Sequence, residues 1–358
     1  MEMLELLNMV VDKKASDLHL ISNSPPVVRV NGELIYTHLV ELDEEEVKRL
    51  IYCLMSDEQK KRFEEEKELD FSYNLKGTAR FRVNVYFQRG APAAALRLVP
   101  HEVLDFAKLG LPDIVKDLTR RPRGLVLVTG PTGSGKSTTL AAMISLINSE
   151  RSCHIVTIED PIEYTHSHRK SIISQREIGT DSHSFQRALR EVLRQDPNVI
   201  LIGELRDLET IQTAITAAET GHLVFGTLHT TDAAQTIDRI IDVFPPYQQQ
   251  QVRTQLSITL QGVVSQQLII KRDGLGRVPA VEVMIATPAV RNMIREGKTF
   301  QIYSNIEMGR DVGMQTLDQA LEDLFKRNLV AEEQAIAVSR EPESLQKKIL
   351  ARMRAKRA

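Results

Sequence analysis

The chain has 358 residues, of which 42% are hydrophobic and 26% are charged, a composition that is ordinary for a globular protein and a length that predicts two domains. The formal charge of −2 gives no overall basic excess and argues against nucleic acid as the main partner. Two cysteines far apart in the sequence exclude a disulfide framework or a cysteine-based zinc site within one chain, and they fit a reduced, cytoplasmic compartment. No apolar run approaches the length of about 18 residues that a membrane-spanning helix needs.

Residues 1–100 are predicted to form a small α+β domain. The strand-like runs Val27–Val30 and Glu33–Tyr36 are joined by Asn31-Gly32, which predicts a hairpin because both turn residues tolerate positive φ. Capping-box patterns that begin at Asp43 and at Ser56 predict two helices, the first reaching residue 55 and the second residue 67.

Two arginines lie on predicted strands near the end of this domain. Apolar and polar residues alternate over 81–87, and 94–99 is a further strand, so Arg82 and Arg97 each face away from the apolar set of their strand. Phosphoryl-transfer sites need positive charge around the γ-phosphate, and we expect this face to close over a bound nucleotide. An ordinary solvated sheet face is the alternative explanation.

The pattern changes after a predicted linker at residues 101–112. From 113 to 358, short apolar runs alternate with helical segments, which predicts an α/β fold whose parallel sheet is covered on both faces. These runs are 125–128, 155–158, 199–202 and 223–225, and residues 314–350 are predicted to form C-terminal helices.

A glycine-rich loop follows the first of these runs and precedes a helical segment. Strand, glycine-rich loop and helix together predict a phosphate-binding loop, in which backbone N–H groups and the helix N-terminus hold the phosphates. We expect Lys136 to reach the β- and γ-phosphates and Ser137 to bind Mg²⁺. Because the chain has no Asn-Lys-x-Asp segment of the guanine-specific kind, ATP is favoured over GTP. The predicted nucleotide-binding residues of the loop are Gly130, Pro131, Thr132, Gly133, Ser134, Gly135, Lys136, Ser137 and Thr138.

Carboxylates follow two other apolar runs. In open α/β sheets, ligands bind where parallel strands end, so acids at these points are candidates for the site. Glu163 is our first choice for the residue that polarises the attacking water, and Glu159 is the alternative. Glu204 closes the run 199–202 and is predicted to hold Mg²⁺, directly or through water. Asp207 is predicted to cap the next helix.

Two histidines bracket the run 223–225. His222 precedes it and His229 follows it. A lone histidine is more often structural than functional, but two of them beside the other strand ends favour a role at the site. We expect His229 to sense the γ-phosphate or to join the Mg²⁺ shell, and His222 to contribute to the same site.

These motifs together resemble a known family. Residues 130–138, 157–163, 203–207 and 218–230 are similar to the Walker A, aspartate, Walker B and histidine boxes of the type II/IV secretion ATPases, and 15–19 (Ala-Ser-Asp-Leu-His) is similar to a segment of their N-terminal domain. The resemblance implies a PAS-like domain at 1–100, a RecA-like ATPase domain at 113–358 and a homohexameric ring. It also implies that nucleotide binds between the two domains, with Arg82 and Arg97 contributing.

Two further features resemble one branch of that family, the ATPases that retract type IV pili. The segment 263–270 runs directly into Lys271-Arg272 with no cysteine, whereas assembly and type II secretion motors carry a four-cysteine zinc insert there. Residues 313–319 are also similar to the retraction branch. The segment that resembles its A-I-R-N-L-I-R-E motif consists of Ala289, Val290, Arg291, Asn292, Met293, Ile294, Arg295 and Glu296.

The resemblance therefore implies an ATP-hydrolysing, Mg²⁺-dependent motor of pilus retraction and twitching motility. It implies a cytoplasmic ring held at the inner membrane by a pilus platform protein, acting indirectly on pilin and without zinc or nucleic acid. The alternatives are the paralogous accessory retraction ATPase, an extension or type II secretion ATPase, and, in another class, a nucleotide-controlled scaffold with little turnover.

Overall fold

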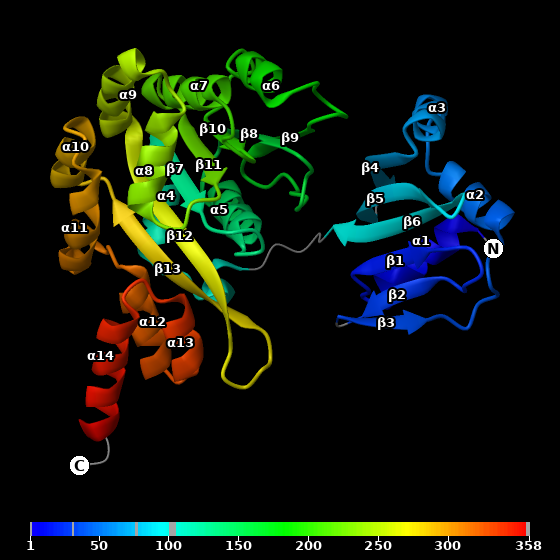
Figure 1. The fold of residues 1–358 in the computed structure, drawn as a ribbon. Coiled ribbons are helices and arrows are strands. Elements are labelled where there is room, and N and C mark those ends of the chain that lie inside the picture. Colours follow the sequence, from blue (N-terminus) through cyan, green and yellow to red (C-terminus); the bar gives the residue numbers. More distant parts are fainter. Residues whose placement is uncertain (1, 31, 76–77, 100–104, 356–358) are drawn as a thin grey trace. The chain divides into compact units, whose positions relative to one another are not determined.

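The computed structural model describes residues 2–30, 32–75, 78–99 and 105–355, and the chain in it forms two compact units (Figure 1). Described residues up to 99 belong to the first unit and those from 105 onward to the second, except that 163–165 group with the first. Each unit has its own hydrophobic core, and the two cores share no residue. No helix in these ranges is long and apolar enough to cross a bilayer.

The first unit is built on a six-stranded antiparallel sheet. The strand order is β3-β2-β1-β6-β5-β4. Its strands are β1 (Asp17–Leu20), β2 (Val27–Val30), β3 (Glu33–Tyr36), β4 (Glu68–Leu75), β5 (Ala79–Gln88) and β6 (Ala91–Val99). Its helices are α1 (Met3–Asp12), α2 (Glu44–Tyr52) and α3 (Asp57–Glu66), whose apolar faces complete the core.

Local chemistry explains where these elements begin. Ser56 and Gln59 form the reciprocal capping box expected before α3, while Asp43 accepts the N–H of Glu46 at 2.7 Å and caps α2. Helix α2 ends at Tyr52 rather than at residue 55, because the chain turns there before the next cap. The predicted hairpin pairs Val27–Val30 with Glu33–Tyr36; of its turn residues, Asn31 lies outside the described part.

The second unit is built on a seven-stranded sheet in the order β13-β12-β7-β11-β10-β8-β9. Every neighbouring pair is parallel except β12 and β13, so the predicted α/β fold with a parallel-rich sheet is confirmed. Its strands are β7 (Gly124–Thr129), β8 (His154–Glu159), β9 (Ile172–Glu177), β10 (Val199–Ile202), β11 (Leu223–Leu228), β12 (Leu260–Ile270) and β13 (Arg277–Ile285).

Helices pack against this sheet, and those at the C-terminal end of the chain form a group beside β12 and β13 (Figure 1). They are α4 (Ile114–Thr119), α5 (Lys136–Glu150), α6 (Phe185–Val192), α7 (Leu208–Glu219), α8 (Ala233–Asp242), α9 (Pro246–Thr259), α10 (Pro288–Arg295), α11 (Ile302–Met308), α12 (Leu317–Lys326), α13 (Glu332–Val338) and α14 (Pro342–Ala355). Short 3-10 helices lie at Phe106–Leu109, Thr299–Gln301 and Arg310–Val312. The predicted C-terminal helices are present, and Leu317, Leu321 and Leu324 of α12 are buried in a small separate core.

Part of the predicted linker belongs to the second unit. Residues Phe106–Leu109 form a 3-10 helix, and the ring of Phe106 is buried in the core of that unit. Residues 101–104 lie outside the described part. The prediction of a linker reaching residue 112 was therefore too long, because an aromatic residue inside it finds an apolar surface to cover.

The separate cores lead to a first prediction. Phe81→Ala should lower the free energy of unfolding of the first unit by about 3–5 kcal/mol, because its ring is fully buried. Phe225→Ala, equally buried in the second unit, is the matched variant. Hydrogen exchange followed along the chain should show lost protection in the first unit for Phe81→Ala and in the second for Phe225→Ala. Equal loss in both units with either variant would contradict the separation.

Candidate functional site

Four neighbouring strands of the second unit end at one edge of the sheet. Strands β7, β11, β10 and β8 are parallel and adjacent, and the last residues of β7 and β11, Thr129 and Leu228, are direct neighbours in register. The residues that follow these strands are therefore brought to the same edge. They include the loop that starts at Gly130, and also His229 and Glu204, while Glu159 is the last residue of β8.

The glycine-rich loop has the backbone that a phosphate cradle requires. Gly130, Gly133 and Gly135 all have positive φ, which glycine adopts without steric cost. A Cβ on Gly130 would lie 2.3 Å from the carbonyl oxygen of Gln266, so no side chain fits there. Gly135 caps α5, whose first turn carries Lys136, and the Lys136 ammonium donates to the carbonyl oxygen of Gly130 at 2.8 Å. The loop and helix N-terminus can therefore hold an anion as the sequence predicts.

Gln266 supports this loop from the neighbouring strand. Its side chain, on β12 and only 2% exposed, donates to the carbonyl oxygen of Ser134 at 2.7 Å and accepts from the Thr139 hydroxyl at 2.9 Å. One amide thus fixes both the loop and the helix that follows it. The sequence analysis missed Gln266, although a glutamine within a buried apolar strand was a signal that it has a partner.

Glu204 and His229 meet at the centre of this edge. His229 Nε2 lies 3.2 Å from Glu204 Oε1, and Arg206 Nη2 lies 2.6 Å from Glu204 Oε2. Burial acts to raise the pKa of Glu204, but Arg206 and, to a smaller extent, His229 outweigh it and hold that pKa below its ordinary value. Glu204 is therefore ionised at neutral pH, with both carboxylate oxygens engaged by cationic or hydrogen-bonding partners.

The two acids predicted near β8 have different surroundings. Glu159 ends the strand, and its Oε1 accepts from the Thr157 hydroxyl at 2.6 Å and from the Gln175 amide at 3.2 Å. Glu163 lies four residues further on and is exposed. Asp207 caps α7 through the N–H of Thr210 at 3.0 Å, as predicted.

His222 lies at the opposite edge of the sheet, so the prediction that both histidines line one site is wrong within a single chain. Strand β11 separates them, and its length places His222 more than about 20 Å from His229. The ring nitrogen Nδ1 of His222 lies 2.9 Å from the carbonyl oxygen of Ala217, and its own carbonyl accepts from Gly124 at the start of β7. In a parallel sheet, the residue before a strand and the residue after it lie at opposite edges, so being close to β11 in the sequence does not bring the two histidines together.

Arg82 and Arg97 are direct neighbours on β5 and β6 of the first unit. Both side chains are exposed, as predicted for the polar face. Asp17 of β1, which lies next to Arg97 in register, accepts from Arg97 Nε at 2.8 Å, while Arg82 Nε lies 3.9 Å from Asp70. Burial acts to raise the pKa of Asp17, but Arg97 outweighs it, so the carboxylate stays charged and fixes that arginine.

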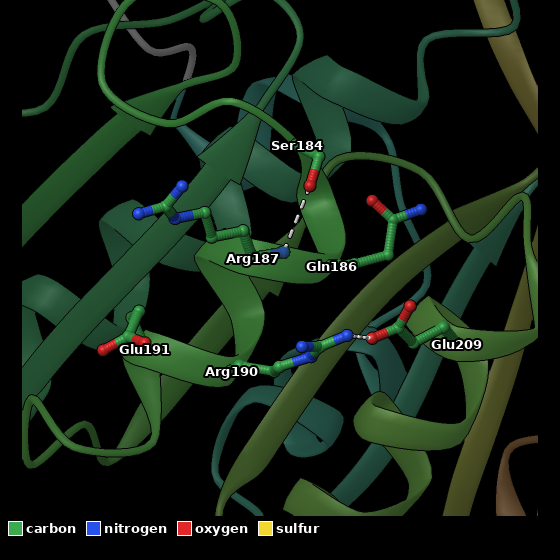
Figure 2. A pocket seen from close by; sticks show the side chains of 6 residues that line it. All are labelled: Ser184, Gln186, Arg187, Arg190, Glu191 and Glu209. Carbon is green, nitrogen blue, oxygen red and sulfur yellow. Dashed lines mark hydrogen bonds and ion pairs between the residues drawn. The ribbon is translucent and has the colours of Figure 1, made fainter.

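A hollow of about 490 Å³ opens elsewhere on the second unit, between α6 and α7 (Figure 2). An ion pair between Arg190 and Glu209 closes one side of it. It contains none of the residues predicted for the nucleotide site. Its polar, open lining consists of Ser184, Gln186, Arg187, Arg190, Glu191 and Glu209.

Comparison with known proteins shows to which family the chain belongs. The family model described as "Type II/IV secretion system protein" matches residues 3–274, which is more than half of the chain. The chain belongs to that family of type II/IV secretion system proteins.

Relatives in this family extend over nearly the whole chain. The chain is 52% identical over 344 residues to the type IV pilus retraction ATPase PilT of Pseudomonas aeruginosa, covering 96% of this chain and 100% of that protein. It is 51% identical over 320 residues to a twitching motility protein of Neisseria gonorrhoeae, covering 89% and 86%. A crystal structure of the pilus retraction motor PilT with bound ADP superposes with a TM-score of 0.91 at 50% identity, covering 97% and 99%.

The segment that resembles the retraction branch of the family forms α10. Val290 and Ile294 are fully buried, so one face of this helix packs into the core of the unit. Arg291 donates from Nη1 to the carbonyl oxygens of Ser257 and Ile258 at 2.7 Å, so it caps the C-terminal end of α9. Arg291 and Arg295 therefore have different surroundings, because Arg291 is half-buried and Arg295 is exposed.

The glycine-rich loop gives a second prediction. Gly130→Ala should lower the free energy of unfolding by about 1–3 kcal/mol, because the new methyl group meets backbone that cannot move freely. Gly133→Ala is the control: its φ is also positive, 78° against 140° for Gly130, but nothing lies within 4 Å of its added Cβ. Urea unfolding of both variants measures the difference. Equal destabilisation would mean that the contact with Gln266 does not restrict the loop.

Proposed function

We propose that this chain is an ATP-hydrolysing motor that powers retraction of type IV pili and so drives twitching motility. The observation that carries the proposal is the convergence on one sheet edge of a phosphate-binding loop and the Glu204–His229 contact. The near full-length likeness to retraction ATPases supports the biological role.

In this proposal the loop binds the phosphates of ATP and Lys136 neutralises their charge. Lys136 exchanges its contacts with the loop carbonyl oxygens for the β- and γ-phosphates. Ser137 in the first turn of α5 would hold Mg²⁺, which supplies further charge neutralisation when bound. Because both oxygens of Glu204 already have partners, Glu204 would reach the ion through water rather than directly.

Glu163 is our choice for the residue that orients the attacking water. A general base must be ionised and accessible to the nucleophile. The carboxylate of Glu159 is engaged by Thr157 and Gln175, which suits a supporting role, whereas Glu163 is exposed. His229, held against Glu204, would respond to the presence of the γ-phosphate. His222, at the other edge, would act outside this site.

The arginines of the first unit complete the proposed site. Arg82 and Arg97 would place two guanidinium groups against the phosphates, in the manner of arginine fingers. We propose that the first unit is a PAS-like domain, that six chains form a ring, and that this ring lies at the cytoplasmic face of the inner membrane. There it would pass displacement to a pilus platform protein, so that pilin subunits leave the pilus base.

Two alternatives within the family remain testable. The loop between β12 and β13 is short and contains no cysteine, which favours a retraction motor over an extension or type II secretion ATPase. The accessory retraction ATPase shares every box, so only complementation separates it. Expressing this chain in a strain that lacks both retraction motors should restore motility. If it restores motility only in a strain that still has the main retraction motor, the accessory role is favoured.

ATP turnover gives a third prediction. Lys136→Ala and Glu204→Gln should each lower steady-state phosphate release by the purified ring by at least about 100-fold, because each removes a charge on which the reaction depends. Glu209→Gln is the control, since it breaks a carboxylate–arginine pair outside the site. Near-normal turnover in Lys136→Ala would overturn the site, and negligible turnover in the wild type would favour a nucleotide-controlled scaffold. Stimulation by DNA would instead indicate a nucleic-acid motor.

The arginines give a fourth prediction. Arg82→Ala and Arg97→Ala should lower kcat by about 1,000-fold, the effect expected of an arginine finger. Arg82→Ala should do so with little change in melting temperature, whereas Arg97→Ala should also lower the melting temperature because the buried Asp17 loses its partner. Arg62→Ala, which removes an exposed arginine paired with Glu66 in the same unit, should leave kcat unchanged. An unchanged rate in Arg82→Ala would remove that residue from the site.

A further inference from the structure

A buried carboxylate of the second unit lies outside the proposed site but contacts the elements around it. Glu282 on β13 is only 2% exposed, and its Oε1 accepts the N–H of Ala233 at 2.9 Å. The backbone N–H of Leu317 also faces this carboxylate and acts to lower its pKa. Ala233 and Leu317 are the first residues of α8 and α12, so Glu282 lies at the N-termini of two helices and fixes the first of them through the Ala233 N–H.

The first of these helices begins directly after the turn that carries His229. Strand β11 ends at Leu228 and α8 begins at Ala233, so only four residues lie between them. Within this turn, Asp232 accepts the N–H of Gln235 at 2.8 Å, and the Thr230 and Thr236 hydroxyls lie 2.7 Å apart. The turn is therefore fastened to the first turn of α8. Any shift of that helix end moves His229 relative to Glu204.

We propose that Glu282 is a positioning residue for ATP hydrolysis, which holds the start of α8 and thereby keeps His229 against Glu204. This inference rests on the proposed function, in which the His229–Glu204 contact responds to the γ-phosphate.

The charges around Glu282 come from the same elements. Burial raises its pKa to about 7, and the nearby Asp232 at the start of α8 acts in the same direction. Opposing them are the N–H groups of Ala233 and Leu317 and the guanidinium of Arg340. Arg340 precedes α14, lies 3.7 Å from Asp232, and stacks over the Tyr303 ring at 4.1 Å. The C-terminal helices thus supply the cation that faces this acidic pair.

Two variants separate positioning from simple stability. Glu282→Met keeps the volume but removes the acceptor, whereas Gln315→Met removes a hydrogen bond to the Val281 carbonyl of the same strand without touching α8. Glu282→Met should raise hydrogen exchange over residues 229–236 by at least about tenfold, because a buried N–H loses its partner. It should also lower kcat by about 10- to 100-fold with KM for ATP nearly unchanged, as a displaced site group does. Gln315→Met should do neither.

A double-mutant cycle tests whether the effect passes through His229. In a His229→Ala background, Glu282→Met should lower kcat by less than about twofold, because the group that it positions is gone. An equal loss of kcat in both backgrounds, or unchanged exchange over 229–236, would overturn the proposal. The exchange measurement needs no turnover, so it decides on Glu282 even if the proposed ATPase function fails.

Glu282→Gln adds a pH test that keeps the acceptor oxygen. A group whose pKa rises on folding from 4.5 to about 7 stabilises the fold fully below pH 4.5, and this contribution is lost as the pH rises through 7. The variant should therefore gain stability relative to the wild type between pH 4.5 and 7, and it should retain most of the wild-type kcat. A relative stability that does not change with pH, together with a kcat as low as that of Glu282→Met, would contradict the role of its carbonyl oxygen as the acceptor for α8.

Discussion

The parallel pairing of four neighbouring strands is the constraint on which the proposed site depends. Because β7, β11, β10 and β8 run in one direction in register, whatever follows each strand is delivered to the same edge. The direction of these strands alone brings segments that are distant in the sequence to one edge. They carry the glycine-rich loop, His229, Glu204 and Glu159. The remaining contacts, such as that of Gln266, adjust positions that the sheet has already set.

Charge balance at that edge explains how the site tolerates an ionised acid that is largely buried. Burying Glu204 alone would favour its protonation, but the contacts with Arg206 and His229 reverse that tendency. In the first unit, Arg97 likewise holds the pKa of Asp17 below its ordinary value against the effect of burial. Glu282 is the opposite case, since backbone N–H groups and a more distant Arg340 do not offset its burial. The same residue type thus has different protonation in different surroundings.

The sequence was enough to predict the parallel α/β fold, the glycine-rich loop and the Asp207 cap, because these depend on short spacings with a local physical cause. The prediction for His222 was wrong because a residue that precedes a parallel strand lies at the opposite edge of the sheet from one that follows it, and closeness to the strand was given more weight than that order. The sequence failed for Gln266 and for the Asp17–Arg97 contact because these depend on register between strands distant in the chain. The predicted linker was too long because composition alone does not reveal that Phe106 finds a core.

The central claim is that ATP hydrolysis at this sheet edge powers pilus retraction. The most direct measurement is pilus length and surface motility in a strain whose only copy of this chain carries Lys136→Ala, compared with the wild-type allele at equal protein level. The account predicts long, persistent pili and no twitching, because pili are still assembled but are not withdrawn. Normal pilus length with normal motility in that strain would contradict it.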